Sequence, residues 1–133
     1  MKKKGWITPG FGENYIRFMN VEDFTEIRNS LPGVTTDIKW EHDLCFSVGK
    51  KLFFVVGLDQ ILTTASFKVS DEDFEELTQR PGFKPAPYMA KHKWIFIEDI
   101  NLVTKKEWFS FITQSYKIIF RKLPKKIQNQ LKG

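Results

Sequence analysis

Cysteine is nearly absent from this chain, since Cys45 is the only one among 133 residues. A single thiol cannot form an intramolecular disulfide or supply a thiolate cluster for zinc. Long apolar runs are missing too: the longest, residues 52–58, is interrupted by Gly57, whereas a membrane helix needs about 20 apolar residues. We therefore expect a cytoplasmic protein that does not span a membrane.

Catalytic and cofactor motifs are also missing. The sequence contains no Gly-rich phosphate loop and no Ser-His-Asp or Cys-His arrangement that points to a nucleophile. The spacing of His42, His92 and Cys45 is not that of zinc ligands. The acidic run 71–76 is typical of a helix start, where the helix dipole favours anions. We expect no enzyme, no cofactor and no metal site.

Aromatic and basic residues, in contrast, are plentiful. Thirteen Phe and four Trp, in a chain that is 41% hydrophobic, suffice for the core of one domain. The net charge of +5 is uneven, because residues 1–18 carry +3, residues 19–104 carry −5 and residues 105–133 carry +7. A basic terminus either attracts nucleic acid through its phosphates or simply keeps the protein solvated.

The hydrophobic periodicity predicts an α+β fold. Helices are expected over 21–30, 71–79 and 105–123, capped by Asn20, Ser70 and Thr104, and strands over 35–40, 44–48, 52–56, 61–69 and 93–97. In the fourth of these strands Lys68 alternates with apolar neighbours, so we expect it to point into solvent. The domain is expected over residues 19–126, after a flexible arm (1–18) and before a basic, polar tail (127–133).

Several strings, in a shared order, resemble the MmcQ/YjbR family of small bacterial proteins. They are SLPGV (30–34), CFSVGKKLF (45–53), FK (67–68), PAPY (85–88), KHKW (91–94), SY (115–116) and KLPKK (122–126). The resemblance implies a two-layer α+β fold with three helices packed on an antiparallel sheet of about five strands. The implied order is helix, four strands, helix, strand, helix, as in secretion-chaperone-like or CyaY-like domains. The family is described as predicted DNA-binding, with a double-wing motif.

Two kinds of binding site remain open at this point. Phosphates need cations, and unpaired bases stack on flat side chains. The candidates for a weak DNA-binding face are Lys68, Lys91, Lys93, Trp94, Lys122, Lys125 and Lys126. The alternative is a protein- or peptide-binding adaptor whose exposed apolar surface contains Tyr88, Trp94 and Phe96. Small-molecule binding is a third possibility, as is a purely structural role for these aromatics with the lysines as a solvated rim. We expect a monomer in each case.

Overall fold

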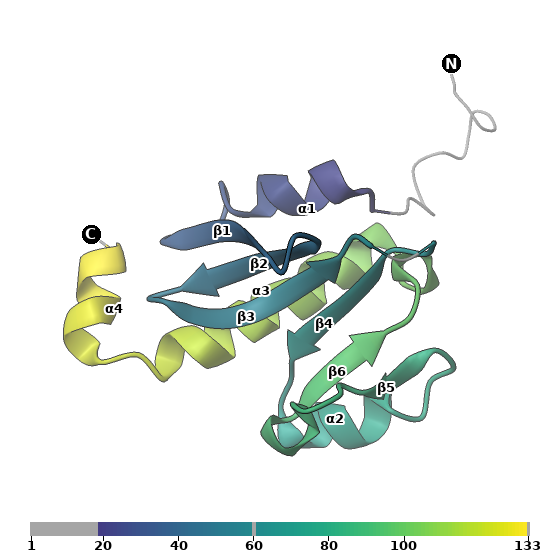
Figure 1. Cartoon of the computed structure of the whole chain (residues 1–133). Coiled ribbons are helices and arrows are strands. Elements are labelled where there is room, and N and C mark those ends of the chain that lie inside the picture. Colours follow the sequence, from purple (N-terminus) through teal and green to yellow (C-terminus); the bar gives the residue numbers. More distant parts are fainter. Residues whose placement is uncertain (1–18, 60, 133) are drawn as a thin grey trace.

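The computed structural model describes residues 19–59 and 61–132, so the arm predicted over residues 1–18 lies outside the described residues. Six strands of the described part form one antiparallel sheet in the order β1-β2-β3-β4-β6-β5 (Figure 1). Their bounds are β1 Val34–Lys39, β2 Asp43–Val48, β3 Lys51–Gly57, β4 Thr64–Lys68, β5 Phe83–Pro85 and β6 Trp94–Ile97. The first four strands form a meander, as the sequence predicted.

Helices flank this sheet. They are α1 Val21–Ile27, α2 Asp71–Leu77, α3 Lys105–Arg121 and α4 Lys125–Lys132, with two short 3-10 helices, η2 Ala90–His92 and η3 Ile100–Leu102. Asn20, Ser70 and Thr104 each accept a hydrogen bond from the backbone three residues later, which confirms the predicted caps. Within the described ranges, no helix is both long enough and apolar enough to cross a bilayer. The long α3 runs behind the strands in Figure 1, and the predicted two-layer α+β class is confirmed.

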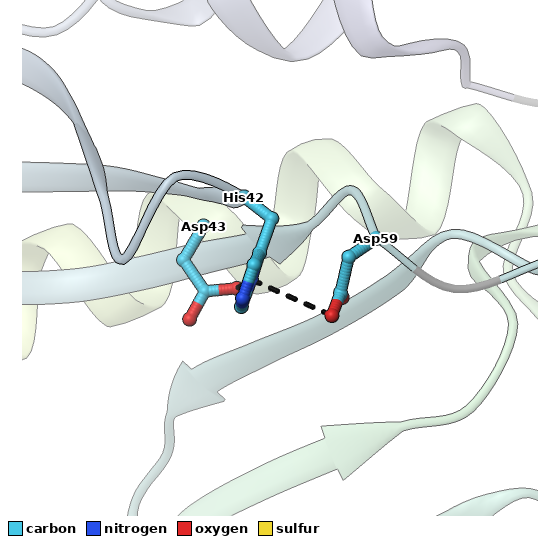
Figure 2. A group of neighbouring side chains, drawn as sticks. All are labelled: His42, Asp43 and Asp59. Carbon is cyan, nitrogen blue, oxygen red and sulfur yellow. Dashed lines mark hydrogen bonds and ion pairs between the residues drawn. The ribbon is translucent and has the colours of Figure 1, made fainter.

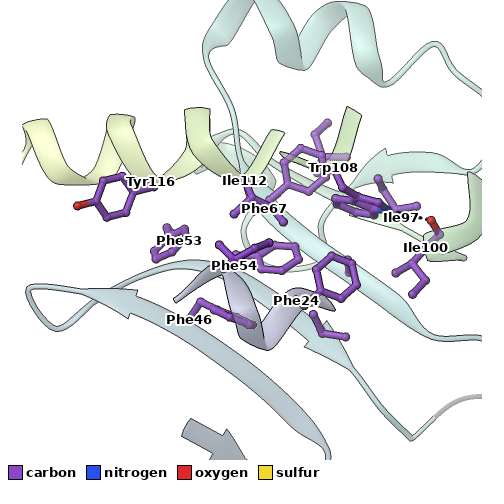
Figure 3. Packing of buried hydrophobic residues seen from close by; sticks show 14 of the residues in the cluster. Phe24, Phe46, Phe53, Phe54, Phe67, Ile97, Ile100, Trp108, Ile112 and Tyr116 are labelled. Atoms are coloured by element: carbon purple, nitrogen blue, oxygen red, sulfur yellow. Dashed lines mark hydrogen bonds between the residues drawn. The ribbon is translucent and has the colours of Figure 1, made fainter. Parts of the chain in front are cut away.

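The core between α3 and the sheet is aromatic (Figure 3). Trp108 of α3 is fully buried. The centroid of its ring lies 5.4 Å from that of Phe24, 5.8 Å from Phe54 and 5.7 Å from Phe67. Edge-on and tilted aromatic pairs of this kind contribute roughly 0.5–1.5 kcal/mol each beyond the burial of their area. The core therefore joins α1, α3 and the central strands into one unit.

Polar side chains of α3 also hold distant segments of the backbone. Three of them donate hydrogen bonds to main-chain carbonyls: Trp108 to Ile100 at 2.9 Å, Ser115 to Lys68 at 2.5 Å and Tyr116 to Pro32 at 2.6 Å. Buried donors of this kind are stable only when they find acceptors. The position of α3 is thus set by specific bonds as well as by apolar packing, and the end of β4 is one of the points it holds.

The sixth strand, β5, was not predicted from the sequence. It has three residues, ends in Pro85 and pairs only with β6 at the edge of the sheet. Three residues are too few to show an alternation of apolar and polar side chains, and proline is tolerated in a sheet mainly at an edge. The sequence pattern therefore gave no sign of this strand.

The prediction of a polar tail over residues 127–133 is wrong for the described residues, because Lys125–Lys132 form the helix α4. Pro124 precedes this helix, and its carbonyl accepts the hydrogen bond of Gln128 N. The Gln128 side chain is buried and donates to the Leu123 carbonyl at 2.8 Å. Leu131 packs against the core and lies over Gly33, where a Cβ would approach it to 2.7 Å. The helix is thus a packed part of the domain.

Candidate anion-binding pocket

A cavity of about 920 Å³ opens where the end of β4, the segment around η2 and the C-terminal end of α3 meet. Its volume falls in the range of small-ligand pockets. We call it the lysine pocket, because five lysines and one carboxylate of the described residues line it: Lys51, Lys68, Lys91, Lys93, Lys122 and Asp71. The remaining lining residues are mainly apolar. A concave surface with such an excess of positive charge favours anionic ligands.

Lys68 is the buried member of this group, with 8% of the residue exposed. Its Nζ donates a hydrogen bond to the His92 carbonyl, and among the described residues it forms no ion pair. Burial lowers the pKa of Lys68, and the nearby charges of Lys122 and Lys93 lower it further, against the opposing effect of Asp71. An ammonium group has three donors. The pocket therefore contains a desolvated cation that forms no ion pair with any described carboxylate.

The prediction that Lys68 points into solvent is wrong. The alternation itself holds, since Lys68 follows the core residue Phe67 and its side chain belongs to the opposite face. That face is covered at this end of β4, because the segment around η2 folds over it. Val69 N donates to the Lys93 carbonyl at 2.9 Å, next to the bond between Lys68 and His92.

Trp94 is also buried, with 3% exposed, so the prediction of an open indole for base stacking is wrong. It pairs with Lys68 in the register of β4 and β6. Ile95 and Ile97, which alternate with it along β6, are buried in the core on the other face of the strand. Trp94 contributes an apolar part of the pocket wall beside the ammonium group of Lys68.

Three further lysines predicted from the sequence line the same pocket. Lys91 and Lys122 are exposed, whereas Lys93 is half-buried. The Lys93 ammonium lies 4.9 Å from the centroid of the Phe74 ring, a cation–π contact. The fold therefore assembles these three lysines around Lys68, although Lys91 and Lys93 come from the η2 segment and Lys122 from the end of α3.

Sequence reasoning missed Lys51. It follows the turn at Gly49 and Lys50 and begins β3. Gly49 has a φ of +56°, and a Cβ there would lie 2.7 Å from a methyl group of Leu123. This close approach packs the turn against the end of α3 and brings Lys51 to the pocket. The basic pair in the turn was visible in the sequence, but its neighbour across the fold was not.

Four other predicted residues lie outside the lysine pocket. Lys125 and Lys126 are exposed in the first turn of α4. Tyr88 is 99% exposed and has a φ of +66°, one residue before Met89, which does line the pocket. Phe96 is half-buried and lines a different cavity. Trp94 and Phe96 lie on the same face of β6, but the three aromatics of the peptide-binding alternative do not line one common pocket of the described residues.

Comparisons with known proteins agree with this architecture. The family model described as YjbR matches residues 29–118. A crystal structure of the Deinococcus radiodurans protein DR2400, with a DUF419 domain, is similar with a TM-score of 0.76 and 21% identity, covering 86% of this chain and 88% of that one. A Pseudomonas syringae protein is similar with a TM-score of 0.62 and 22% identity, covering 75% of this chain and 98% of that one. No curated protein matches the chain.

Proposed function

The chain belongs to the YjbR family, and on that basis we propose that it is a small nucleic-acid-binding module that takes phosphate groups into the lysine pocket, and is not an enzyme. The observation that carries this proposal is Lys68, a buried ammonium with no carboxylate partner among the described residues. Burying a cation is unfavourable unless a partner is found. A phosphate that enters the pocket supplies the missing negative charge.

The shape of the pocket favours a single strand over a duplex. A volume of about 920 Å³ accommodates a nucleotide-sized portion of a ligand. A flexible single strand can direct one phosphate towards Lys68, whereas a duplex meets only the exposed lysines at the rim, Lys91 and Lys122. The fully exposed ring of Tyr88, next to the pocket-lining Met89, offers a flat surface on which a neighbouring base can stack.

Binding of this kind is dominated by charge and is therefore weak and salt-dependent. On single strands the logarithm of affinity falls with the logarithm of salt concentration by about 0.7 per neutralised phosphate. Lys125 and Lys126 on α4 extend the positive potential beyond the pocket without lining it. They increase the electrostatic attraction of a polyanion to this side of the protein, while the pocket determines where its phosphate is held.

Fluorescence anisotropy with a labelled single strand and a matched duplex, each at two salt concentrations, tests the proposal. The variants are Lys91→Gln and Lys122→Gln, and the matched control is Lys106→Gln, an exposed lysine in the first turn of α3 that does not line the pocket. We expect tighter binding to the single strand, and on that strand a salt slope reduced by about 0.7 in each pocket variant but not in the control. Equal losses in all three variants would show that only overall charge matters, which would contradict a pocket.

The alternative function, a protein- or peptide-binding adaptor, is not supported by a feature comparable to the lysine pocket. Tyr88 is exposed in a loop. Trp94 lies in the wall of the lysine pocket, and Phe96 lines a second cavity. Within the described residues the three do not line a common pocket, and no specific observation favours a peptide as the ligand.

A further inference from the structure

Three potential metal ligands meet at the opposite end of the β2–β3 hairpin from the turn that carries Lys51 (Figure 2). His42 precedes β2, Asp43 begins it and Asp59 follows the end of β3. One nitrogen of His42, Nδ1, lies 3.3 Å from Asp43 Oδ1 and 3.6 Å from Asp59 Oδ2. All three donor atoms lie within 4.8 Å of one another. An imidazole therefore faces two carboxylates at a single point.

The contact between His42 Nδ1 and Asp43 Oδ1 is a long hydrogen bond, and both distances also suit ligands of a shared cation. An N–H to O bond normally measures about 2.7–3.2 Å, and both contacts are longer than that. Zinc holds nitrogen and oxygen ligands at about 2.0–2.2 Å in a tetrahedron, so neighbouring ligand atoms are about 3.3–3.6 Å apart. The two separations measured from His42 Nδ1 lie in this range.

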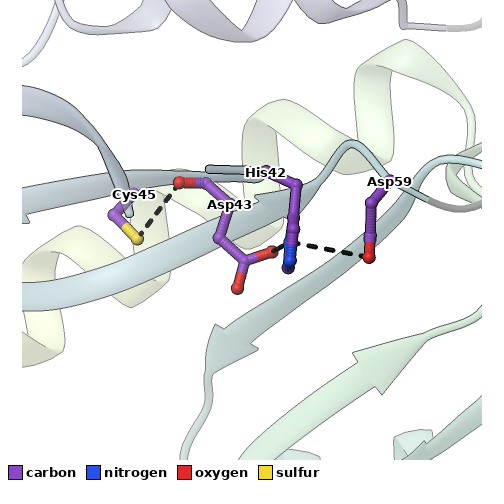
Figure 4. Close-up of polar contacts among 4 residues, drawn as sticks. All are labelled: His42, Asp43, Cys45 and Asp59. Carbon is purple, nitrogen blue, oxygen red and sulfur yellow. Dashed lines mark hydrogen bonds and ion pairs between the residues drawn. The ribbon is translucent and has the colours of Figure 1, made fainter. Parts of the chain in front are cut away.

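The backbone holds the three ligands in this arrangement. Asp43 is paired with Gly57 in the register of β2 and β3, and Leu58 N donates to the His42 carbonyl at 2.8 Å. The two chain segments that carry the ligands are thereby tied to each other. The carbonyl of Asp43 also accepts a contact from the buried Cys45 thiol at 3.7 Å (Figure 4). A cation would find its ligands already close together, which reduces the entropy lost on binding.

A second observation is the charge of the cavity into which these groups open. It has a volume of about 590 Å³, and the described residues that line it include Asp43, Asp59 and Glu98 together with His42 but no lysine or arginine. Glu98 is neutralised by Lys84 at 2.6 Å, whereas among the described residues the imidazole of His42 is the one ion-pair partner of Asp43 and Asp59. In a chain with a net charge of +5, this hollow is locally acidic and has room for water or a ligand on a bound ion.

We propose that His42, Asp43 and Asp59 form a binding site for a first-row divalent cation of the zinc type, separate from the lysine pocket. One imidazole and two carboxylates are a ligand set that suits zinc, and magnesium, which prefers oxygen ligands and retains its waters, suits it less well. Three protein ligands leave at least one coordination position open towards the cavity. That position can take water or an oxygen of a small anionic ligand.

Calorimetric titration of the untagged full chain with Zn²⁺ tests this proposal, with Mg²⁺ as the comparison ion. The chain offers a matched control, because its two histidines are His42 and His92 and the latter lines the lysine pocket. We expect one Zn²⁺ site per chain, weakened at least tenfold in His42→Ala and Asp59→Asn and unchanged in His92→Ala. The visible absorption spectrum of added Co²⁺ gives a second readout, since it reports on imidazole and carboxylate ligation directly.

Thermal unfolding with and without Zn²⁺ distinguishes the site from a simple ion pair. A bound ion raises the Tm of the wild-type chain and of His92→Ala, but not of His42→Ala. If Asp59→Asn lowers the Tm while Zn²⁺ changes nothing in any variant, the three groups are only an ion pair between two loops and the proposal is wrong. Equal weakening by His42→Ala and His92→Ala would also overturn it, because binding would then lie elsewhere.

Discussion

Replacement of Lys68 by methionine separates the role of its ammonium group from the role of its side-chain volume. Lys68 is 8% exposed, and its Nζ donates to the His92 carbonyl. Methionine retains an unbranched apolar chain of similar length, so little cavity is created. What disappears is the charge, together with its hydrogen bond.

The magnitude follows from two opposing terms. The lost charged hydrogen bond to His92 destabilises the fold by about 1.5–3 kcal/mol. Removal of a desolvated cation has the opposite effect, because the lowered pKa of Lys68 means that the folded state disfavours its protonated form. We therefore expect the free energy of unfolding of Lys68→Met to change by less than about 1.5 kcal/mol. Lys68→Ala also removes about three buried methylene groups, roughly 2.4 kcal/mol, and should be the less stable variant by about that amount.

Urea denaturation and single-strand binding, measured on both variants, test this reasoning together. We expect Lys68→Met to retain near-wild-type stability while it loses about tenfold in affinity for the single strand, the effect of one charge-assisted contact. Stability as low as that of Lys68→Ala would show that the ammonium is needed to hold the η2 segment. An unchanged affinity would refute the role of Lys68 in the pocket.

Three further outcomes are expected. As pH rises through the lowered pKa of Lys68, in a window below its ordinary value of 10.5, the ammonium loses its charge and single-strand affinity should fall. In the same window the stability measured by urea denaturation should rise, because the unfolded chain keeps a proton that the folded chain has lost. Gly49→Ala should destabilise the protein by about 1–3 kcal/mol in the same assay, because the residue has a φ of +56° and its new methyl group would meet Leu123; unaltered stability would contradict the packing of this turn. Tyr88→Ala should lower the affinity for single strands about tenfold by anisotropy and leave the Tm unchanged, since the ring is 99% exposed, whereas an equal loss on duplex DNA would argue against stacking.

The sequence predicted the fold well where elements are long or carry caps. Thr104 and the apolar stripe that contains Trp108 and Ile112 predicted α3, and the alternation around Phe46 predicted β2. The helix α4 was not predicted, because its apolar residues Ile127 and Leu131 are too few to form a visible stripe among lysines and glutamines. Its helical state depends on contacts with the rest of the domain.

The candidate site was predictable in residue type but not in exposure. Sequence composition identified Lys68, Trp94 and their basic neighbours, and alternation assigned Lys68 to the correct face of its strand. That this face is covered depends on the segment around η2, which lies more than twenty residues further along the chain. Hairpin pairing of β2 with β3 would have been enough to bring His42 near Asp59, so that cluster was within reach of a register argument.

The hydrogen bonds from α3 side chains to distant main-chain carbonyls affect how fast the protein folds. Tyr116 and Pro32 are 84 residues apart in the chain, and Ser115 and Lys68 are 47 apart. Contacts between residues so far apart in the chain form only after large loops have closed, which costs entropy. We therefore expect the chain to fold more slowly than helical bundles of this size. A proteolytic fragment without α3 would leave a row of phenylalanines such as Phe54 and Phe67 uncovered on its sheet, and should self-associate instead of refolding.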